Sequence, residues 1–193
     1  MQPLTRADLL GLERYADERA DFRARVIAHK KQRTVHLGEH LTFIFEDRLT
    51  TQYQIQEMLR IERIFEAEAI QDEIDTYNPM IPEGSNLKAT MLIEYPDVEQ
   101  RRRELMRLRE IEHHIELQVG ELPPVKAIAD EDLPRSNDEK TAAVHFLRFE
   151  LSAEMIVAWR DGATVALRST LPAERLEGTL TADQRSTLGA DFA

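Results

Sequence analysis

The sequence predicts an α+β fold with a largely antiparallel sheet of about six or seven strands. Segments of alternating apolar and polar residues are joined mostly by short turns, helical patterns lie between pairs of these segments, and no internal repeat is present. A chain of 193 residues can bury one sizeable core. We therefore expect a single α+β domain over residues 1–168, followed by a C-terminal extension, residues 169–193, that is partly ordered at best.

Two long helices are expected in the first half of the chain. Residues 6–31 follow a potential capping residue, Thr5, and carry apolar side chains at helical spacing. Residues 49–77 contain neither glycine nor proline and are rich in helix-forming residues. Asn78 ends this second pattern because it precedes Pro79, and helical geometry is disfavoured in a residue before proline. The prediction is a long N-terminal helix and one continuous long helix at about 49–77.

The remaining elements are expected to alternate between strands and shorter helices. Gly38 marks a tight connection between the first two strands. Charged amphipathic patterns predict helices at 97–109 and 152–159, and a polar connection is expected over 130–139. Alternating or apolar runs bounded by turn residues predict strands at 33–37, 41–46, 88–95, 111–119, 125–129, 142–151 and 164–168.

Composition excludes several classes of site and partner. The chain has no cysteine, which removes disulfides, thiolate nucleophiles and every metal or cluster site that needs sulfur ligands. Asp and Glu number 36 against 25 Lys and Arg, and the net charge of −11 opposes binding to nucleic acids and to anionic membranes. The start of the chain lacks a secretion signal, and no apolar stretch is long enough for a membrane helix. We therefore expect a soluble cytoplasmic protein with neither a nucleic-acid nor a membrane partner.

Common catalytic signatures are absent from the sequence. The seven glycines lie too far apart along the chain to form a dinucleotide fingerprint or a phosphate-binding loop. The serine-hydrolase motif Gly-x-Ser-x-Gly is also missing. The sequence therefore leaves open whether the protein is an enzyme, and any chemistry would have to use oxygen or imidazole groups.

The helix expected at 49–77 carries several glutamates. Glu62, Glu66 and Glu73 lie on one side of a continuous helix, near an apolar stripe. Such a group could bind a hard cation or pair with an arginine, because a buried carboxylate needs a compensating partner. The simpler interpretation, which we favour, places these glutamates in water or at the margin of the core.

Three histidines are candidates for ligands or proton-transfer groups. His145 lies in a nearly continuous apolar strand, where it is either an acid, base or ligand or, more simply, a hydrogen-bonded structural histidine. Glu110 and His113 have Glu-x-x-His spacing, but residues three apart point to opposite faces of a strand, so we expect His113 to be a core histidine. His114 shares a strand face with Glu112 and a second glutamate, and we expect this face to be solvated.

Six blocks of the sequence are long and idiosyncratic: Ala28–Arg33, Phe45–Arg48, Tyr53–Glu62, Tyr77–Thr90, Ile128–Asp132 and Lys140–Leu151. Together, over roughly residues 6–168, they resemble the bacterial family known as domain of unknown function 3501. The family has no established activity. The resemblance implies redox or oxidative-stress physiology, because members are often encoded beside rubrerythrin-like and iron–sulfur oxidoreductase proteins.

Polar residues inside these blocks, together with Glu94 shortly after the fourth block, are the candidates for a functional site, and His113 and His114 are not among them. The candidates are Glu57, Arg60, Glu62, Asn86, Lys88, Glu94, His145, Arg148 and Glu150.

Two functions of different class are consistent with these observations. The first, which we prefer, is a non-enzymatic accessory protein in bacterial redox or oxidative-stress physiology that binds a redox protein partner or forms a homo-oligomer. The alternative is a metal-binding or metal-dependent protein that holds a divalent ion with Glu57, Glu62, Glu94 and His145. A small-molecule pocket lined by the loop at 77–88 is a third hypothesis.

Overall fold

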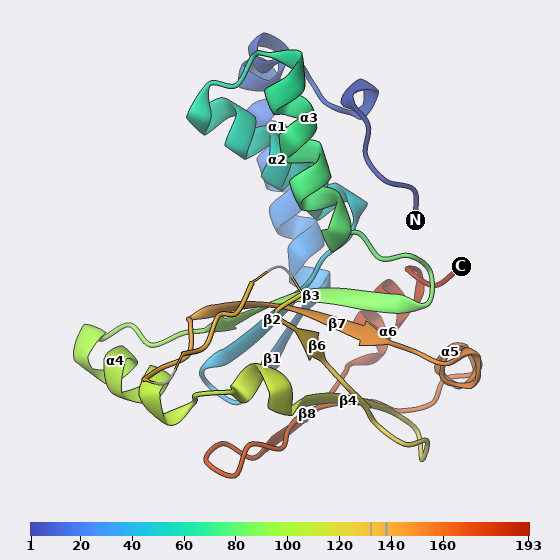
Figure 1. Cartoon of the computed structure of the whole chain (residues 1–193). Helices are drawn as coiled ribbons and strands as arrows, with labels where there is room; N and C mark the ends of the chain where they lie inside the picture. The colour runs from blue at the N-terminus through green and yellow to red at the C-terminus, as the bar shows by residue number, and fades with distance from the viewer. Residues whose placement is uncertain (132, 138) are drawn as a thin grey trace.

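The chain folds into a helical arm that rises from a β-sheet body (Figure 1). The computed structural model describes residues 1–131, 133–137 and 139–193. Asp132 and Asp138, which fall in the polar connection predicted over 130–139, lie outside the described residues. The arm helices and the antiparallel sheets occupy separate regions of the molecule, which confirms the predicted α+β class.

Three helices form the arm: α1 (Leu12–Gln32), α2 (Arg48–Glu62) and α3 (Ala67–Tyr77). Helix α1 confirms the long N-terminal helix that the sequence predicts, but it begins at Leu12 instead of residue 6, because Arg6–Asp8 after Thr5 form a separate 3₁₀ turn. Its inner face builds a small apolar cluster against α2, in which Tyr15, Phe22 and Val26 are buried. Asp47 fixes the start of α2, because its carboxylate accepts hydrogen bonds from two backbone N–H groups of the first turn. In the part of the chain that the structure describes, no helix is both long and apolar enough to cross a membrane.

The helix predicted over 49–77 is interrupted between α2 and α3. Arg63 follows α2 in the left-handed region, with φ of 55°, and Glu66 is the N-cap of α3. The break lets α3 fold back along α2, so that Ile74 is buried in a cluster with Ile55. A continuous helix would carry the apolar side chains of its second half away from the rest of the arm. Tertiary packing therefore overrides the high helix propensity of this segment.

Within the described residues, the strands form two antiparallel sheets of five and four strands instead of the single sheet that the sequence predicts. The first sheet has the order β1 (Thr34–Leu37), β2 (Leu41–Phe45), β3 (Asn86–Ile93), β7 (Val144–Glu150) and β6 (Ile128–Ala129). The second sheet has the order β5 (Val125–Lys126), β4 (Ile115–Val119), β8 (Val165–Ser169) and β9 (Leu176–Thr179).

Two predicted strands are shorter than their pattern of alternating apolar and polar residues indicates. As a result, the strands divide into two sheets. The strand predicted at 125–129 divides at Ala127, so that the residues before it pair with β4 and those after it pair with β7. The strand predicted at 111–119 loses its first residues, Ile111–His114, which form a 3₁₀ turn. His113 therefore lies in a turn, and the expectation of a core histidine in a strand is wrong.

A hydrophobic core fills the space between the two sheets. The first sheet contributes Phe43, Met91 and Leu147, and the second contributes Leu117 and Leu167, all at most 2% exposed. Three shorter helices contribute further residues to the margins of this core: α4 (Val98–Arg107), α5 (Ala153–Arg160) and α6 (Ala182–Gly189).

Residues 169–193 are folded, which differs from the partial order that the sequence predicts. They form β9 and α6, and Leu188 and Phe192 enter the main core. The ring of Phe192 packs edge-on against Trp159, with the ring centroids 5.2 Å apart. Their sequence carries no periodic signal because short elements bury only a few scattered apolar residues each, and long-range contacts fix them.

A buried ion pair completes the attachment of the C-terminal segment. The carboxylate of Asp191 accepts two hydrogen bonds from the guanidinium of Arg33, a side chain that is only 2% exposed. The same guanidinium donates to the backbone carbonyl oxygens of Phe45 and Glu46 at the end of β2. The end of α1, one strand end and the C-terminal segment therefore meet at a single cation.

We expect the substitution Asp191→Ala to lower the free energy of unfolding by about 3 kcal/mol, because it leaves the buried Arg33 guanidinium without two of its acceptors. Urea unfolding followed by circular dichroism at neutral pH measures the change. The matched control is Asp183→Ala in α6, an exposed side chain whose loss should cost less than about 1 kcal/mol. Equal stability of Asp191→Ala and the wild type would contradict this role of the ion pair.

Candidate functional site

Glu57 joins α1 to α2 inside the arm. Its carboxylate accepts hydrogen bonds from the Tyr15 hydroxyl at 2.7 Å and from the Arg19 guanidinium at 2.8 and 2.7 Å, and the Arg60 guanidinium lies 3.7 Å away. The hydrogen bonds from Arg19 lower the pKa of Glu57 to about 2, although burial acts in the opposite direction. This carboxylate is already paired with cations, which fits a structural role for Glu57 and Arg60.

The other residues predicted as metal ligands lie in different parts of the molecule. Glu62 is exposed at the end of α2. Glu94 directly follows β3 and accepts a hydrogen bond from the Thr42 hydroxyl at 2.5 Å. His145 lies in β7 and is fully buried. Among the described residues, no group of three or more potential ligands contains these side chains or Glu57, so the structure does not bring the four predicted ligands together.

Four of the predicted site residues do come together, across β3 and β7 of the first sheet. The pairing of these strands sets Asn86 opposite Glu150 and Lys88 opposite Arg148. Glu150 accepts hydrogen bonds from Asn86 at 3.2 Å and from Arg148 at 2.5 Å. Arg148 also donates two hydrogen bonds to Glu131, at 2.9 and 2.8 Å. These charges satisfy one another, so the group serves to tie β3, β7 and the segment after β6 together.

His145 is the predicted site residue that reaches a cluster of potential ligands. Its Nε2 atom lies 2.8 Å from the Thr141 hydroxyl, 3.0 Å from the Ala142 carbonyl oxygen and 3.8 Å from Glu112 Oε2. Its Nδ1 atom is buried without a hydrogen-bond partner among the described residues. Burial lowers the pKa of His145, although Glu112 acts in the opposite direction. The imidazole is therefore neutral at neutral pH.

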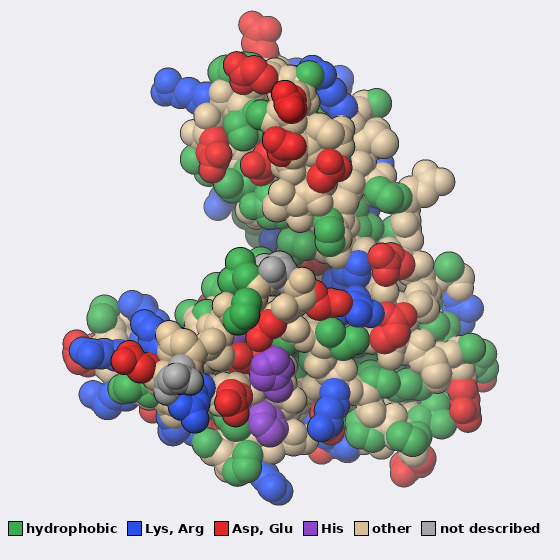
Figure 2. Space-filling view, in the orientation of Figure 1, with side chains coloured by type: hydrophobic (Ala, Val, Ile, Leu, Met, Phe, Trp, Pro, Cys, Tyr) green, Lys and Arg blue, Asp and Glu red, His purple; other side chains and the backbone are tan. Residues whose placement is uncertain are grey.

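Glu112, His113 and Asp130 form that cluster. The Nε2 atom of His113 lies 4.0 Å from Glu112 Oε1 and 3.5 Å from Asp130 Oδ2, and the three ligand atoms all lie within 4.8 Å of one another. Glu112 is buried, Asp130 is partly buried and His113 is exposed. The Glu112 carboxylate also accepts hydrogen bonds from the hydroxyls of Ser136 and Thr141. Figure 2 shows histidine side chains beside acidic ones on the body below the arm.

The sequence did not identify Glu112 and Asp130 as site residues. The alternation over 111–119 predicted a strand that separates Glu112 from His113, whereas the 3₁₀ turn buries the first and exposes the second. Asp130 approaches them only because the chain crosses between the sheets. The one available signal was the concentration of acidic and imidazole side chains within residues 110–114.

An apolar surface lies at the far end of the arm. We call residues 9–12 and 59–70 the arm tip. Ile61 and Phe65 are 63% and 64% exposed there, more than the other large apolar side chains that the structure describes. The arm tip also contains a groove of about 210 Å³ whose apolar lining includes Leu9, Leu10, Leu59, Ile64, Phe65 and Ile70.

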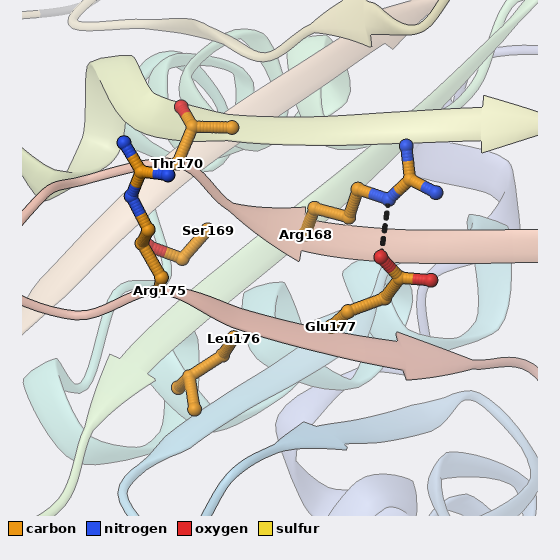
Figure 3. Close-up of a pocket in the computed structure, with 6 residues that line it drawn as sticks. All are labelled: Arg168, Ser169, Thr170, Arg175, Leu176 and Glu177. Carbon is orange, nitrogen blue, oxygen red and sulfur yellow. Dashed lines mark hydrogen bonds and ion pairs between the residues drawn. The ribbon is translucent and has the colours of Figure 1, made fainter.

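A second hollow, of about 440 Å³, lies where β8 and β9 are connected (Figure 3). It is lined by Arg168, Ser169, Thr170, Arg175, Leu176 and Glu177. Arg168 on β8 pairs with Glu177 on β9 at 2.8 Å, so the charge of this arginine is already compensated. A small-molecule pocket lined by the loop at 77–88 is the third hypothesis from the sequence. Residues of that loop line neither this hollow nor the arm-tip groove.

Comparison with known proteins gives a family and a structural relative. The family model described as "Protein of unknown function (DUF3501)" matches residues 3–192. A crystal structure of a novel protein of unknown function from Burkholderia pseudomallei K96243 is 48% identical in sequence, covers 100% of both chains and gives a TM-score of 0.94. Among curated proteins, no significant match is found. The family match includes the C-terminal segment, beyond the region of the sequence resemblance.

The substitution Glu57→Gln tests the structural role of the ion pair in the arm. Because the pKa of Glu57 is lowered to about 2 in the folded state, its charge stabilises the fold above the unfolded-state pKa of about 4.3, and this contribution is lost as the pH falls towards 2. At neutral pH we expect a loss of about 1–2 kcal/mol, because partial exposure of Arg19 weakens the pair. The difference from the wild type should shrink between about pH 5 and pH 2.

Urea unfolding at several pH values measures this difference. Glu18→Gln is the control, because it breaks the exposed pair with Arg14 and should cost less than about 0.5 kcal/mol. A Glu57→Gln effect that stays constant down to about pH 2 would show that the charge of Glu57 is not the cause.

Proposed function

The chain belongs to the DUF3501 family of proteins of unknown function, and from that premise we propose that it is a non-enzymatic accessory protein that binds a protein partner through the arm tip. The observation that carries the proposal is the apolar groove of the arm tip, whose lining includes the exposed side chain of Phe65, together with the exposed Ile61 on the same tip. Several exposed apolar side chains at one place favour contact with a partner, because each gains free energy when it is removed from water.

The arm tip is accessible and incompletely packed. The arm projects away from the body, so a partner can approach its end (Figure 1). The apolar cluster at this end buries Leu59 and Ile74, but Ile64 and Ile70 are only partly buried against it. An apolar side chain of a partner, placed in the groove, would complete the burial of these two residues, as an anchor does at the centre of an interface.

Helix α3 and the residue before it carry negative charge on the arm, whereas Arg6 adds a positive charge to the lining of the groove. Glu73 of α3 is partly buried, and burial together with repulsion from Glu62 and Asp72 raises its pKa. Acidic side chains gather on the arm in Figure 2. A partner with Lys or Arg beside an apolar anchor would be attracted to this surface and would relieve the repulsion. The acidic residues of this segment are Glu66, Glu68, Asp72, Glu73 and Asp75.

Redox proteins are the partner class that we propose. The resemblance to the family implies rubrerythrin-like and iron–sulfur oxidoreductase proteins as the first candidates. Because the chain has no cysteine, it cannot supply thiolate ligands to an iron–sulfur cluster. Its contribution would be to bind and position such a partner, which matches an accessory role.

Phe65→Glu should weaken the binding of a rubrerythrin-like protein at least about tenfold, because it places a charge in the apolar contact. Biolayer interferometry with both purified proteins measures the dissociation constant. Val157→Glu is the matched control, because Val157 is 56% exposed on α5, away from the arm, and its substitution should leave binding unchanged. Binding should also weaken at high salt, because acidic residues contribute to it.

Equal affinities of the wild type and Phe65→Glu would place the interface elsewhere and reject the arm tip. If neither a rubrerythrin-like protein nor an iron–sulfur oxidoreductase binds the wild type, the redox partner is rejected. Sedimentation velocity over a range of concentrations then tests whether the arm tip instead contacts a second copy of the chain, in which case Phe65→Glu and not Val157→Glu would abolish the dimer.

A further inference from the structure

We infer that Glu112, His113 and Asp130 form a binding site for a divalent transition-metal ion. This inference concerns the body of the molecule and does not depend on the arm tip. The three side chains offer one imidazole nitrogen and two carboxylate oxygens, all within 4.8 Å of one another. A donor set that mixes nitrogen and oxygen suits ions such as Zn²⁺, Fe²⁺ and Mn²⁺.

The spacing of the ligand atoms fits a metal shell after a small adjustment. Metal–ligand bonds of about 2.1 Å place neighbouring ligand atoms about 3.0–3.4 Å apart. The Nε2 atom of His113 is 3.5 Å from Asp130 Oδ2 and 4.0 Å from Glu112 Oε1. The side chain of His113 is 51% exposed, so its ring can rotate towards the two carboxylates without disturbing the core.

The backbone holds the two segments of the site in place. Glu110 and Asp130 both adopt the left-handed conformation, with φ of 68° and 58°. The first precedes the 3₁₀ turn that carries Glu112 and His113, and the second directly follows β6. Aspartate is among the few residues that tolerate this conformation. Because the turn leads into β4 of one sheet and β6 belongs to the other, the pairing of both sheets fixes the distance between the ligands.

Buried polar groups support Glu112 from behind. Ser136 donates a hydrogen bond to Glu112 Oε1, and Thr141 donates one to Oε2 at 3.2 Å. His145 Nε2 lies 3.8 Å from Oε2, and the Nδ1 atom of this fully buried ring has no hydrogen-bond partner among the described residues. Such an outer shell orients a ligating carboxylate. A bound cation would also offset the cost of burying the charge of Glu112.

The competing interpretation is a group of side chains that only pair with one another. In that arrangement the His113 ring would only bridge the carboxylates of Glu112 and Asp130 at the surface. Added metal ions would then have no specific effect, and the neighbouring His114 would be as good a surface ligand as His113. The two interpretations therefore give opposite results in a metal titration.

Isothermal titration calorimetry of the full chain, freed of metal with EDTA and dialysed, tests the site with ZnCl₂ and MnCl₂. We expect one ion per chain, with Zn²⁺ bound more tightly than Mn²⁺. His113→Ala should weaken Zn²⁺ binding at least about tenfold. His114→Ala is the matched control, because it removes an imidazole from the same turn but outside the cluster, and it should leave the affinity unchanged.

Asp130→Asn is a second test that preserves the fold, because asparagine also tolerates the left-handed conformation and only the charge is lost. It should weaken Zn²⁺ binding by a factor similar to that of His113→Ala, and circular dichroism verifies that both variants are folded. The site is overturned if the wild type binds neither ion at millimolar concentration. It is also overturned if His113→Ala binds as tightly as the wild type, or if His114→Ala loses as much affinity as His113→Ala.

Discussion

The relative placement of the arm, the first sheet and the C-terminal segment depends on the buried guanidinium of Arg33. This group donates to the carbonyl oxygens of Phe45 at 2.8 Å and Glu46 at 3.2 Å, and it pairs with Asp191. It also lies 3.5 Å from the carboxylate of Asp47, which caps the start of α2. Because one rigid planar group satisfies all of these acceptors, the end of α1, the end of β2, the start of α2 and the C-terminal segment cannot shift independently.

Two buried carboxylates share this cation, and their surroundings differ. Burial opposes the charge of Asp47, yet Arg33, the backbone N–H of Thr50 and His29 together hold its pKa below the usual range. Burial raises the pKa of Asp191 despite its hydrogen bonds to Arg33. The ring of His29, with Nε2 2.5 Å from Asp47 Oδ2, supplies a second partner for the carboxylate that caps α2. A buried network of this kind adds little net free energy to folding, because the cost of desolvating its charges cancels much of their attraction. Its main effect is to hold the connected elements in one arrangement.

Periodicity along the sequence was sufficient for the α+β class and for α1, because both depend on local patterns. The break at Arg63 could not be predicted, since helix propensity is high throughout the segment and only the packing of α3 against α2 favours it. The division at Ala127 could not be predicted either. It arises because the residues before Ala127 pair with β4 of one sheet and those after it pair with β7 of the other. At the candidate sites, the sequence indicated that a buried His145 needs a partner, and the structure supplies the Thr141 hydroxyl, with Glu112 Oε2 3.8 Å away. Asp130 lies in the same region but is remote from His145 in sequence, so no local pattern could connect the two.

The division at Ala127 places the proposed metal site at the junction of the two sheets. Asp130 follows a strand of the first sheet, whereas the turn with Glu112 and His113 leads into a strand of the second, so an ion held between them would join the sheets where the chain crosses from one to the other. An ion that binds only the folded state stabilises it in proportion to the logarithm of ion concentration, and here the gain would concentrate at the sheet junction. The arm would gain little, because its apolar clusters are separate from the core between the sheets. The proposed partner contact at the arm tip would therefore not depend on an ion in the body. Coupling between the two would have to cross the arm–body junction, where the contacts of Arg33 and the hydrogen bond from Glu46 to Lys88 lie.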